Sequence, residues 1–558
     1  MSASRRVSAA AQEAISTAAD DITAAARTVV GGLLRHPWGQ SSASVYETAR
    51  LVALAPWLPG HTERLRFLLN AQRPDGGWGA PDPGHALVPT LSATEALLAT
   101  LRTQGSHDGI THTELARAAG QGLVLLNSWL HGREPLSLPD TTGIELITSS
   151  LTALITEHVE DLHDKPHCAS ALRESAGPLQ APCAPGADGA LTTIRNRLTS
   201  GQSLPGKILH LLEVAGSAAE QAAGVRPTLI GTVGASPAAT AAWLGTAPPP
   251  DHPSRCYLEA AVAQHGGPVS VAVPMTHFER GWVLHWLARA GVPLAVPPRL
   301  LNELRAAVGP TGAAGGSGLP TDADTSAGVL YALCLWGVPR PPDLLWQYEL
   351  DTHFCTWPGE DGRSVTTNAH VLEAFGQYLS VSRNGRLTDR YATTTAKVSR
   401  WLCTQQYDDG HWEDRWHASP YYATACATLA LNRFGGTASQ PAVERARRWV
   451  VNTQCADGSW GGWAGTAEET AYALHILALN GPSTHPRTAE AIRLGTQFLR
   501  SAVRTDPVHG GSAAGAEPPP LWIDKDLYHP TAIVRSVILA ALHLHGGRPA
   551  FEETGPYL

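Results

Sequence analysis

The segment Gln454-Cys-Ala-Asp-Gly-Ser-Trp460 decides how the rest of the chain is interpreted, because related segments occur twice more. These are Gln72-Arg-Pro-Asp-Gly-Gly-Trp78 and Gln406-Tyr-Asp-Asp-Gly-His-Trp412, with the same Gln-to-Trp spacing and the same Asp-Gly placement. An Asp-Gly turn lets a Trp fold back onto the end of a neighbouring helix, where the Gln amide can bond free backbone groups. The repeat therefore predicts a structural link between helices in both halves of the chain, and two related helical domains.

Most of the chain between these motifs has a helical pattern. Residues 8–34 are Ala-rich, with apolar residues close to helical spacing, and predict one amphipathic helix. Helical stretches then alternate with Pro- and Gly-rich joints at 132–143, 173–190 and 244–254, and 301–318 resembles a junction. Few segments show the alternation that is typical of strands. The sequence predicts an all-α protein.

Composition excludes several classes of function. A chain of 558 residues, 43% hydrophobic and 16% charged, predicts two or three folded domains. The net charge of −8 argues against a nucleic-acid partner. Eight cysteines without a CxxC pair fit the reduced thiols of a cytoplasm better than disulfides. No apolar run approaches the roughly 18 residues of a membrane span. Arg5 and Arg6 are not followed by the hydrophobic core of a secretory signal. We therefore expect a cytoplasmic protein without stable membrane insertion.

A second stretch, Asp322-Ala-Asp324-Thr325, carries the candidate chemistry. Pro320 and Thr321 precede it as helix start signals, so Asp322 should be an N-cap and Asp324 should lie in the first turn. Two interpretations stay open at this point. The acids either cap a helix, or their crowding lets the pair hold a proton whose loss the helix N-terminus favours.

The three Gln-to-Trp segments resemble the QW motifs of the terpene cyclase and squalene cyclase superfamily, which is built from α/α barrels. Within it, the chain resembles the bacterial class II cyclases of linear isoprenyl diphosphates. The resemblance covers most of the chain and rests on these segments in order: Ser44-Val-Tyr46-Glu-Thr-Ala, Gly143-Ile-Glu145-Leu, Leu209-His210-Leu-Leu-Glu213, Gly234-Ala-Ser236-Pro-Ala-Ala-Thr240-Ala, Phe278-Glu279-Arg280-Gly-Trp282, Ser364-Val-Thr-Thr-Asn368-Ala-His370, Trp416-His417-Ala-Ser-Pro420-Tyr421-Tyr422-Ala-Thr and Trp522-Ile-Asp-Lys525-Asp-Leu-Tyr528-His-Pro530.

The resemblance implies an all-α fold of two α/α-barrel domains, the βγ architecture of class II terpene cyclases. Residues 8–34 would join 301–558 in the β domain, which carries the catalytic acid. Residues 35–300 would form the inserted γ domain. The substrate would lie between the two barrels.

The family's acid motif, Asp-x-Asp-Asp, implies roles for four residues. Asp324 matches the proton donor to the terminal alkene, and Asp322 matches the first carboxylate. Thr325 stands where most members have a further Asp, a variant that bears on product and chain length. Asn368 resembles the Asn that hydrogen-bonds the donor, and a buried structural Asn is the alternative.

The resemblance also implies the substrate-binding residues. Aromatic faces would stabilise the carbocation, and the candidates are Trp282, Trp357, Tyr421 and Tyr422. The retained diphosphate needs cations and one Mg²⁺, with these candidates: Lys207, Arg280, Lys525 and Arg535 as anion ligands and Glu213 as the metal contact. The alternatives are a core role for each aromatic and an ordinary salt bridge for each charge. His210, His417 and His529 are candidate terminal bases or structural histidines.

The implied reaction is a protonation-initiated cycloisomerisation that closes two rings, with the diphosphate retained. The Asp-x-Asp-Thr motif favours farnesyl diphosphate and a drimenyl product, and the alternative is geranylgeranyl diphosphate with a copalyl- or halimadienyl-type product. The partner is thus a small isoprenyl diphosphate, and a homodimer is one assembly that the resemblance allows. Three other interpretations stay open: a squalene-type cyclase, a non-catalytic α/α-barrel binding protein and a zinc-dependent protein prenyltransferase.

Overall fold

Helices dominate the computed structural model, which describes residues 21–546 except 104–108, 133–134, 163–178, 181, 183–185, 247, 361, 383–387, 480–484 and 506–518. After a helix described over residues 21–35, the first half contains α2 (Val45–Leu54), α3 (His61–Ala71), α4 (Pro83–Arg102), α5 (His112–Leu130), α6 (Ile144–Leu162), α8 (Ala187–Thr199), α9 (Gly206–Leu209), the 3-10 helix η1 (Leu212–Ala219), α10 (Pro237–Leu244) and α11 (Pro253–Ala263). The all-α prediction is confirmed.

The second half contains α12 (Thr276–Arg289), α13 (Pro298–Ala307), α14 (Ala323–Leu335), η2 (Pro342–Tyr348), α15 (Val365–Val381), α16 (Thr388–Thr404), α17 (Pro420–Phe434), η3 (Thr437–Ser439), α18 (Gln440–Asn452), α19 (Ala467–Leu477), α20 (Pro486–Thr505) and α21 (Thr531–His545). Its two-residue strands form two antiparallel pairs, β1 (Ala313–Ala314) with β2 (Thr321–Asp322) and β3 (Trp522–Ile523) with β4 (Leu527–Tyr528). None of the described helices is both long and apolar enough to span a bilayer.

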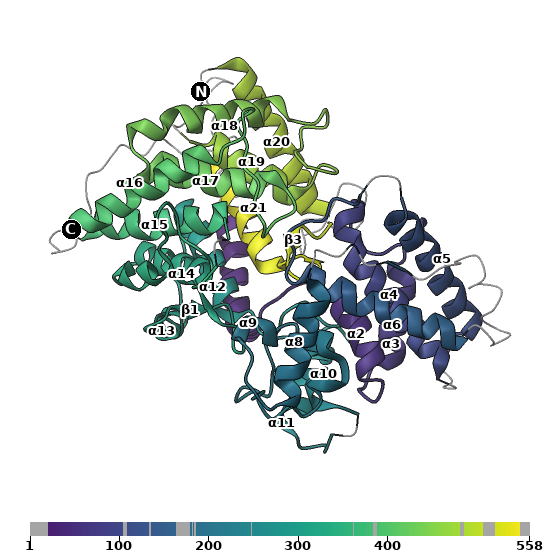
Figure 1. Cartoon of the computed structure of the whole chain (residues 1–558). Helices are drawn as coiled ribbons and strands as arrows, with labels where there is room; N and C mark the ends of the chain where they lie inside the picture. The colour runs from purple at the N-terminus through teal and green to yellow at the C-terminus, as the bar shows by residue number, and fades with distance from the viewer. Residues whose placement is uncertain are drawn as a thin grey trace.

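The helices gather into two bodies with separate hydrophobic cores (Figure 1). The N-terminal helix belongs to the C-terminal body, where Ala26 and Leu33 are fully buried among side chains of the second half. Figure 1 shows this purple helix among the teal and yellow helices, away from the blue helices of the N-terminal body. The first and last parts of the chain therefore share one core, and the N-terminal body is inserted between them.

The cores change from one body to the other near residues 271–273, earlier than the predicted boundary at residue 300. Helices α12 and α13 lie in the C-terminal core, where Trp282, Trp286 and Leu304 are fully buried. The glycines before Asp322 suggested a domain junction. In the structure they form a tight loop that connects β1 to β2, and Gly318 in this loop lies against Thr232 and Ala235 of the N-terminal body.

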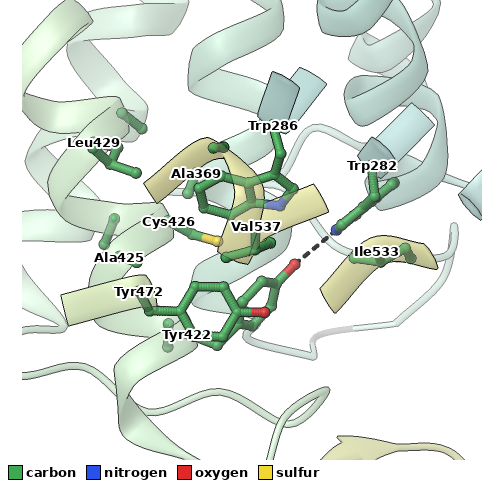
Figure 2. Close-up of a cluster of buried hydrophobic side chains, with 14 of the residues drawn as sticks. Trp282, Trp286, Ala369, Tyr422, Ala425, Cys426, Leu429, Tyr472, Ile533 and Val537 are labelled. Carbon is green, nitrogen blue, oxygen red and sulfur yellow. Dashed lines mark hydrogen bonds between the residues drawn. The ribbon is translucent and has the colours of Figure 1, made fainter. Parts of the chain in front are cut away.

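Aromatic side chains close the centre of the C-terminal barrel (Figure 2). Trp282 and Trp286 of α12 meet Tyr422 of α17 and Tyr472 of α19, and the indole N–H of Trp282 donates to the Tyr422 hydroxyl oxygen at 2.8 Å. The cluster gives the barrel a rigid aromatic centre directly behind Tyr422.

The three repeated motifs make the same bonds, as the sequence predicted. Each Trp indole N–H donates to the carbonyl ten residues earlier, at 2.7 Å for Trp78, 2.8 Å for Trp412 and 2.7 Å for Trp460. Each Gln amide donates to the Gly carbonyl of its own turn and to a carbonyl of the second α-helix further along the chain, which is α5, α18 or α20. Since every Trp is fully buried, each motif fixes the end of one helix against its neighbour.

We expect Gln406→Ala to destabilise the C-terminal barrel by about 1–3 kcal/mol, because the Gly410 and Ala442 carbonyls lose their side-chain donor. The adjacent Gln405→Ala is the matched control, since the Gln405 amide makes only an exposed contact with Thr404 among the bonds seen. Thermal unfolding followed by circular dichroism measures both. Equal melting temperatures for the two variants would contradict the structural role of the motif.

Candidate active site

A tight glycine loop places the acid motif. The loop pairs Ala313 with Asp322 and Ala314 with Thr321 in the short β1–β2 ladder. A Cβ atom added at Gly316 would lie 1.9 Å from the Pro274 carbonyl oxygen, so only glycine fits there. The chain therefore folds back closely enough to hold Asp322 at the start of α14.

Asp322 caps α14 and thereby orients Asp324. The Thr325 N–H donates to Asp322 Oδ1 at 2.6 Å, and the Ala323 N–H donates to the Thr356 carbonyl at 2.9 Å. Asp324 lies in the first turn, with 15% of its side chain exposed. Asp322 is therefore the cap of α14, and both Asp322 and Asp324 line the cavity.

Charge at this helix start favours a held proton. Burial and the neighbouring Asp324 carboxylate raise the pKa of Asp322 to about 7. His370 of α15 contacts Asp324, with Nδ1 at 2.7 Å from Oδ1. Burial alone would lower the pKa of His370, but the Asp324 carboxylate raises it well above its usual value. The imidazolium therefore donates to Asp324 and stabilises its carboxylate form.

Asn368 does not contact Asp324, so the predicted hydrogen bond between them is corrected. Its amide nitrogen donates to the carbonyls of Phe354 and Ser364, both at 2.9 Å, and its oxygen accepts from the Phe354 N–H at 2.9 Å. Residues two positions apart on a helix point about 200° apart, so Asn368 and His370 cannot both face Asp324. Asn368 instead fixes the segment whose Thr356 carbonyl holds the start of α14.

A cavity of about 160 Å³ opens in front of the acids, between the two bodies. Asp322, Asp324 and Thr325 form one part of its wall. Aromatic side chains form much of the rest: Phe278, Trp357, Trp416, Tyr422, Trp522 and Tyr528. The N-terminal body contributes Thr142, Lys207 and His210. The site thus combines an acid, an aromatic wall and a cation.

Of the four predicted aromatic residues, Trp357 and Tyr422 line the cavity. Trp282 lies behind it, with its ring centroid 5.0 Å from that of His370, and supports that side chain. Tyr421 faces the other way, where it packs on Trp449 with ring centroids 4.7 Å apart. Trp282 and Tyr421 therefore act in the core, which was the alternative for each.

Of the four predicted anion ligands, Lys207 lines the cavity, with 44% of its side chain exposed and an ion pair to Glu360. Arg280 is buried, where it pairs with Glu303 at 2.7 Å and donates to the Leu33 carbonyl at 3.3 Å. It therefore holds the end of the N-terminal helix, and the prediction that Arg280 binds the diphosphate is wrong. Arg535, half-buried on α21, is not part of the cavity wall.

Lys525 and Glu213 bind each other. The predictions that Lys525 binds the diphosphate and that Glu213 binds the metal are therefore wrong. The Lys525 ammonium is fully buried and donates to Glu213 Oε1 at 2.8 Å and to Glu47. Glu213 Oε1 also accepts from the Tyr46 hydroxyl at 2.8 Å. Within the described ranges, no group of three or more His, Cys, Asp or Glu side chains could hold a metal ion. The predicted Mg²⁺ contact at Glu213 therefore does not fit this donor set.

Two of the candidate bases, His210 and His417, are hydrogen-bonded, and His529 Nδ1 lies 3.8 Å from Glu468 Oε2. His210 donates from one ring nitrogen to the Gly234 carbonyl at 2.6 Å and from the other to Asp524 at 3.2 Å. His417 contacts Glu468 at 3.2 Å and, like His529, is absent from the cavity wall. All three fit the structural alternative.

Sequence reasoning missed several residues of the site. His370 stood in a quoted motif without a role, and its distance from Asp324 along the chain hid their contact. Phe278, Trp416, Trp522 and Tyr528 also lay in quoted motifs, and their aromatic character was the signal that could have found them.

Comparisons with known proteins agree with this geometry. The family described as "Squalene-hopene cyclase C-terminal domain" matches residues 360–504. The chain is 41% identical over 525 residues to "Ent-copalyl diphosphate synthase" of Streptomyces sp. (strain KO-3988), covering 93% of this chain and 96% of that protein. It is 38% identical over 522 residues to "Labda-7,13-dienyl diphosphate synthase" of Streptomyces clavuligerus, covering 91% and 90%.

A solved structure gives the same result for the fold. The structure of "ent-Copalyl diphosphate synthase from Streptomyces platensis" superposes with a TM-score of 0.86 at 41% identity, covering 94% of this chain and all of that one. Relatives of this identity and coverage share the whole two-barrel architecture. The chain therefore belongs to the class II terpene cyclases of bacteria.

Proposed function

We propose that this cyclase converts geranylgeranyl diphosphate into a bicyclic diphosphate of the copalyl or related labdane type. The observation that carries the proposal is the 41% identity over nearly the whole chain to a copalyl diphosphate synthase. A labdane product is also named for the Streptomyces clavuligerus relative. These two products differ from each other, so the relatives support the substrate class but not one product. The shape of the cavity determines the position of the last double bond.

The relatives favour this alternative over the farnesyl diphosphate that the Asp-x-Asp-Thr motif suggested. The physical reason lies in the position of Thr325, which follows Asp324 in the first turn of α14. There it would meet the terminal isoprene unit, which is the same in both substrates. The two substrates differ in length toward the diphosphate end, so the residue at position 325 does not distinguish them.

Asp324 is the proton donor of this proposal, and it donates when it carries the proton that it shares with Asp322. Its proton adds to the terminal alkene carbon, and two further alkenes close two carbon–carbon bonds in turn. His370 and the N-terminus of α14 stabilise the carboxylate that is left. The cation then loses a proton from a carbon next to the positive charge, so the net reaction is an isomerisation.

The aromatic wall stabilises the cation without attacking it. The faces of Trp357, Tyr422 and Trp522 offer negative electrostatic potential, while their carbon atoms make poor nucleophiles. At the other end, Lys207 exchanges Glu360 for the diphosphate, which carries more negative charge. A requirement for Mg²⁺ stays a prediction, and assays with and without EDTA measure it.

The pH dependence follows from the raised pKa of Asp322, about 7. Below that pH the two carboxyl groups share a proton, and above it they lose the proton, so we expect activity to fall as the pH rises through about 7. For stability, the folded state binds this proton more tightly than the unfolded chain, whose Asp pKa is about 4. The unfolding free energy therefore decreases between about pH 4 and 7. Asp322→Asn should remove both effects, and pH–rate and pH–melting profiles measure them.

Incubation with each substrate tests the function. The protein is incubated separately with geranylgeranyl diphosphate, farnesyl diphosphate and squalene, and the dephosphorylated products are identified by mass spectrometry and NMR. We expect a bicyclic C20 alcohol, a kcat/KM at least about tenfold lower for the C15 substrate, as for other losses of buried apolar contact, and unchanged squalene. A preferred C15 bicycle would restore the farnesyl interpretation, and linear alcohols alone would contradict the proposal.

A further inference from the structure

The β3–β4 hairpin, residues 522–528, is bonded at its base to its own barrel, where the Ile523 N–H donates to the Trp416 carbonyl at 2.9 Å, and at its tip to the N-terminal body. Its strands are two residues long and pair Trp522 with Tyr528 and Ile523 with Leu527. A two-stranded hairpin of this size has little stability of its own, so its position depends on the groups that anchor it. Because Trp522, Ile523 and Tyr528 line the cavity, those anchors also set the shape of the site.

On the cavity side, the hairpin presents an oriented aromatic surface. The Trp522 ring lies with its centroid 4.7 Å from that of Tyr422 and 5.7 Å from that of Phe278. Its indole N–H donates to Glu468 Oε1 at 2.7 Å. Trp522 thus joins the hairpin to the aromatic wall on which the cation would be stabilised.

At the tip, three consecutive charged residues bind the N-terminal body. Asp524 accepts from His210 at 3.2 Å. Lys525 is bonded to Glu47 and, at 2.8 Å each, to Glu213 and Ser236. A run of charges at a turn is usually solvated, but Lys525 is fully buried here.

The third residue of the tip completes the anchor. Asp526 accepts from the Ser44 hydroxyl at 2.8 Å and from the Tyr46 N–H at 3.0 Å, at the start of α2. Glu47, a partner of Lys525, itself accepts from the Ala238 N–H at 2.7 Å at the start of α10. The tip is therefore fixed to α2, η1 and α10 of the N-terminal body.

A buried ion cluster of this kind adds little net stability, since desolvation opposes the attraction between the charges. It does restrict geometry, because displacing the tip would leave buried charges without partners. The partners of Lys525 in this cluster belong to the body that does not carry the acid. The effect of the cluster on the site is therefore one of position, transmitted along the hairpin to Trp522 and Tyr528.

We propose that Lys525, held by Glu47 and Glu213, is a positioning residue for product specificity: it docks the hairpin on the N-terminal body and so fixes the Trp522 and Tyr528 faces relative to the cation. The proposal rests on the cyclisation proposed above. Displacement of the wall leaves the first protonation at Asp324 intact, but it changes where the cation rests and which neighbouring proton is lost.

The test compares two variants that differ at Lys525. In Glu213→Gln, Lys525 keeps Glu47 and Ser236, and we expect the wild-type product profile. In Glu213→Gln/Lys525→Met, Glu47 keeps its bonds to Ser236 and Ala238 and the net charge of the cluster is unchanged. Here we expect a roughly tenfold or greater increase in the fraction of alternative or monocyclic products, with a larger change in kcat than in KM.

A matched control removes another buried ion pair of the N-terminal body. Arg50 pairs with Glu95, which also binds His158 at 3.1 Å, and neither Arg50 nor Glu95 lines the cavity. Arg50→Met/Glu95→Gln should lower the melting temperature and leave the product ratio unchanged. If it alters the ratio as much as the Lys525 variant does, the positioning role is overturned.

The remaining outcomes are also decisive. If the wild type forms no ring, the proposed function fails. If the wild type cyclises and the Lys525 variant gives the same products in the same ratio, the inference about the hairpin fails. Should the double variant not fold, Asp526→Ala removes the bonds to Ser44 and Tyr46 instead. The same shift of products is then expected, and an unchanged ratio overturns the proposal.

Discussion

We expect Asp324→Asn to lower the rate of ring formation by at least about 10⁴-fold, which corresponds to about 5 kcal/mol of activation free energy. An amide has the shape of the carboxyl group and can still accept from His370, but it cannot supply the proton. The fold should be unaffected, because the cap of α14 is made by Asp322. Single-turnover assays of bicyclic product give the rate.

The control for this variant is Asp351→Asn, which changes an exposed acid away from the cavity. It should have wild-type activity. Retention of full activity by Asp324→Asn, with an unchanged melting temperature, would show that another group supplies the proton and would contradict the assignment of Asp324 as the donor.

We expect His370→Gln to lower the rate by about 10²–10³-fold, the effect of removing one donor to a developing negative charge. The imidazolium donates to Asp324 at 2.7 Å and stabilises the carboxylate that protonation of the alkene creates. A neutral amide at this position is a weaker donor. The control His265→Gln alters an exposed histidine of the N-terminal body, which contacts Ser270 at 3.0 Å, and should leave the rate unchanged.

A pH series separates catalysis from packing at His370. Its pKa is raised in the folded state, chiefly by Asp324 against the opposing effect of burial. The ion pair therefore stabilises the fold fully below about pH 6.5, the usual His value, and loses this effect as the pH rises through the raised pKa. The difference in melting temperature between wild type and His370→Gln should shrink at high pH. A difference that is independent of pH would show that the imidazole is neutral.

Much of the fold could be predicted from short-range signals. The Gln, Asp-Gly and Trp of each motif lie within seven residues. The roles of Trp412 and Trp460 in linking helix ends could therefore be predicted before any helix was placed. The start of α14 was equally local, since an N-cap acid and a first-turn acid follow from the order of the residues.

The rest depended on contacts between distant parts of the chain. The sequence does not show whether Asn368 or His370 contacts Asp324, because only the rotation of α15 about its axis decides which side chain faces it. Lys525 is a cation in a family-like motif, but Glu47 and Glu213, which neutralise it, lie far from it in the chain. Whether a charge faces a ligand or another side chain is decided by packing, which local patterns do not contain.

Cyclisation in D₂O tests the central claim most directly. If Asp324 delivers a solvent-derived proton to the terminal alkene, the bicyclic diphosphate made from geranylgeranyl diphosphate carries one deuterium, at the ring carbon that was the terminal alkene CH. NMR of the dephosphorylated alcohol locates it, and Asp324→Asn gives no such product. A product without deuterium at that carbon, or release of inorganic pyrophosphate with ring formation, would contradict protonation-initiated cyclisation with a retained diphosphate.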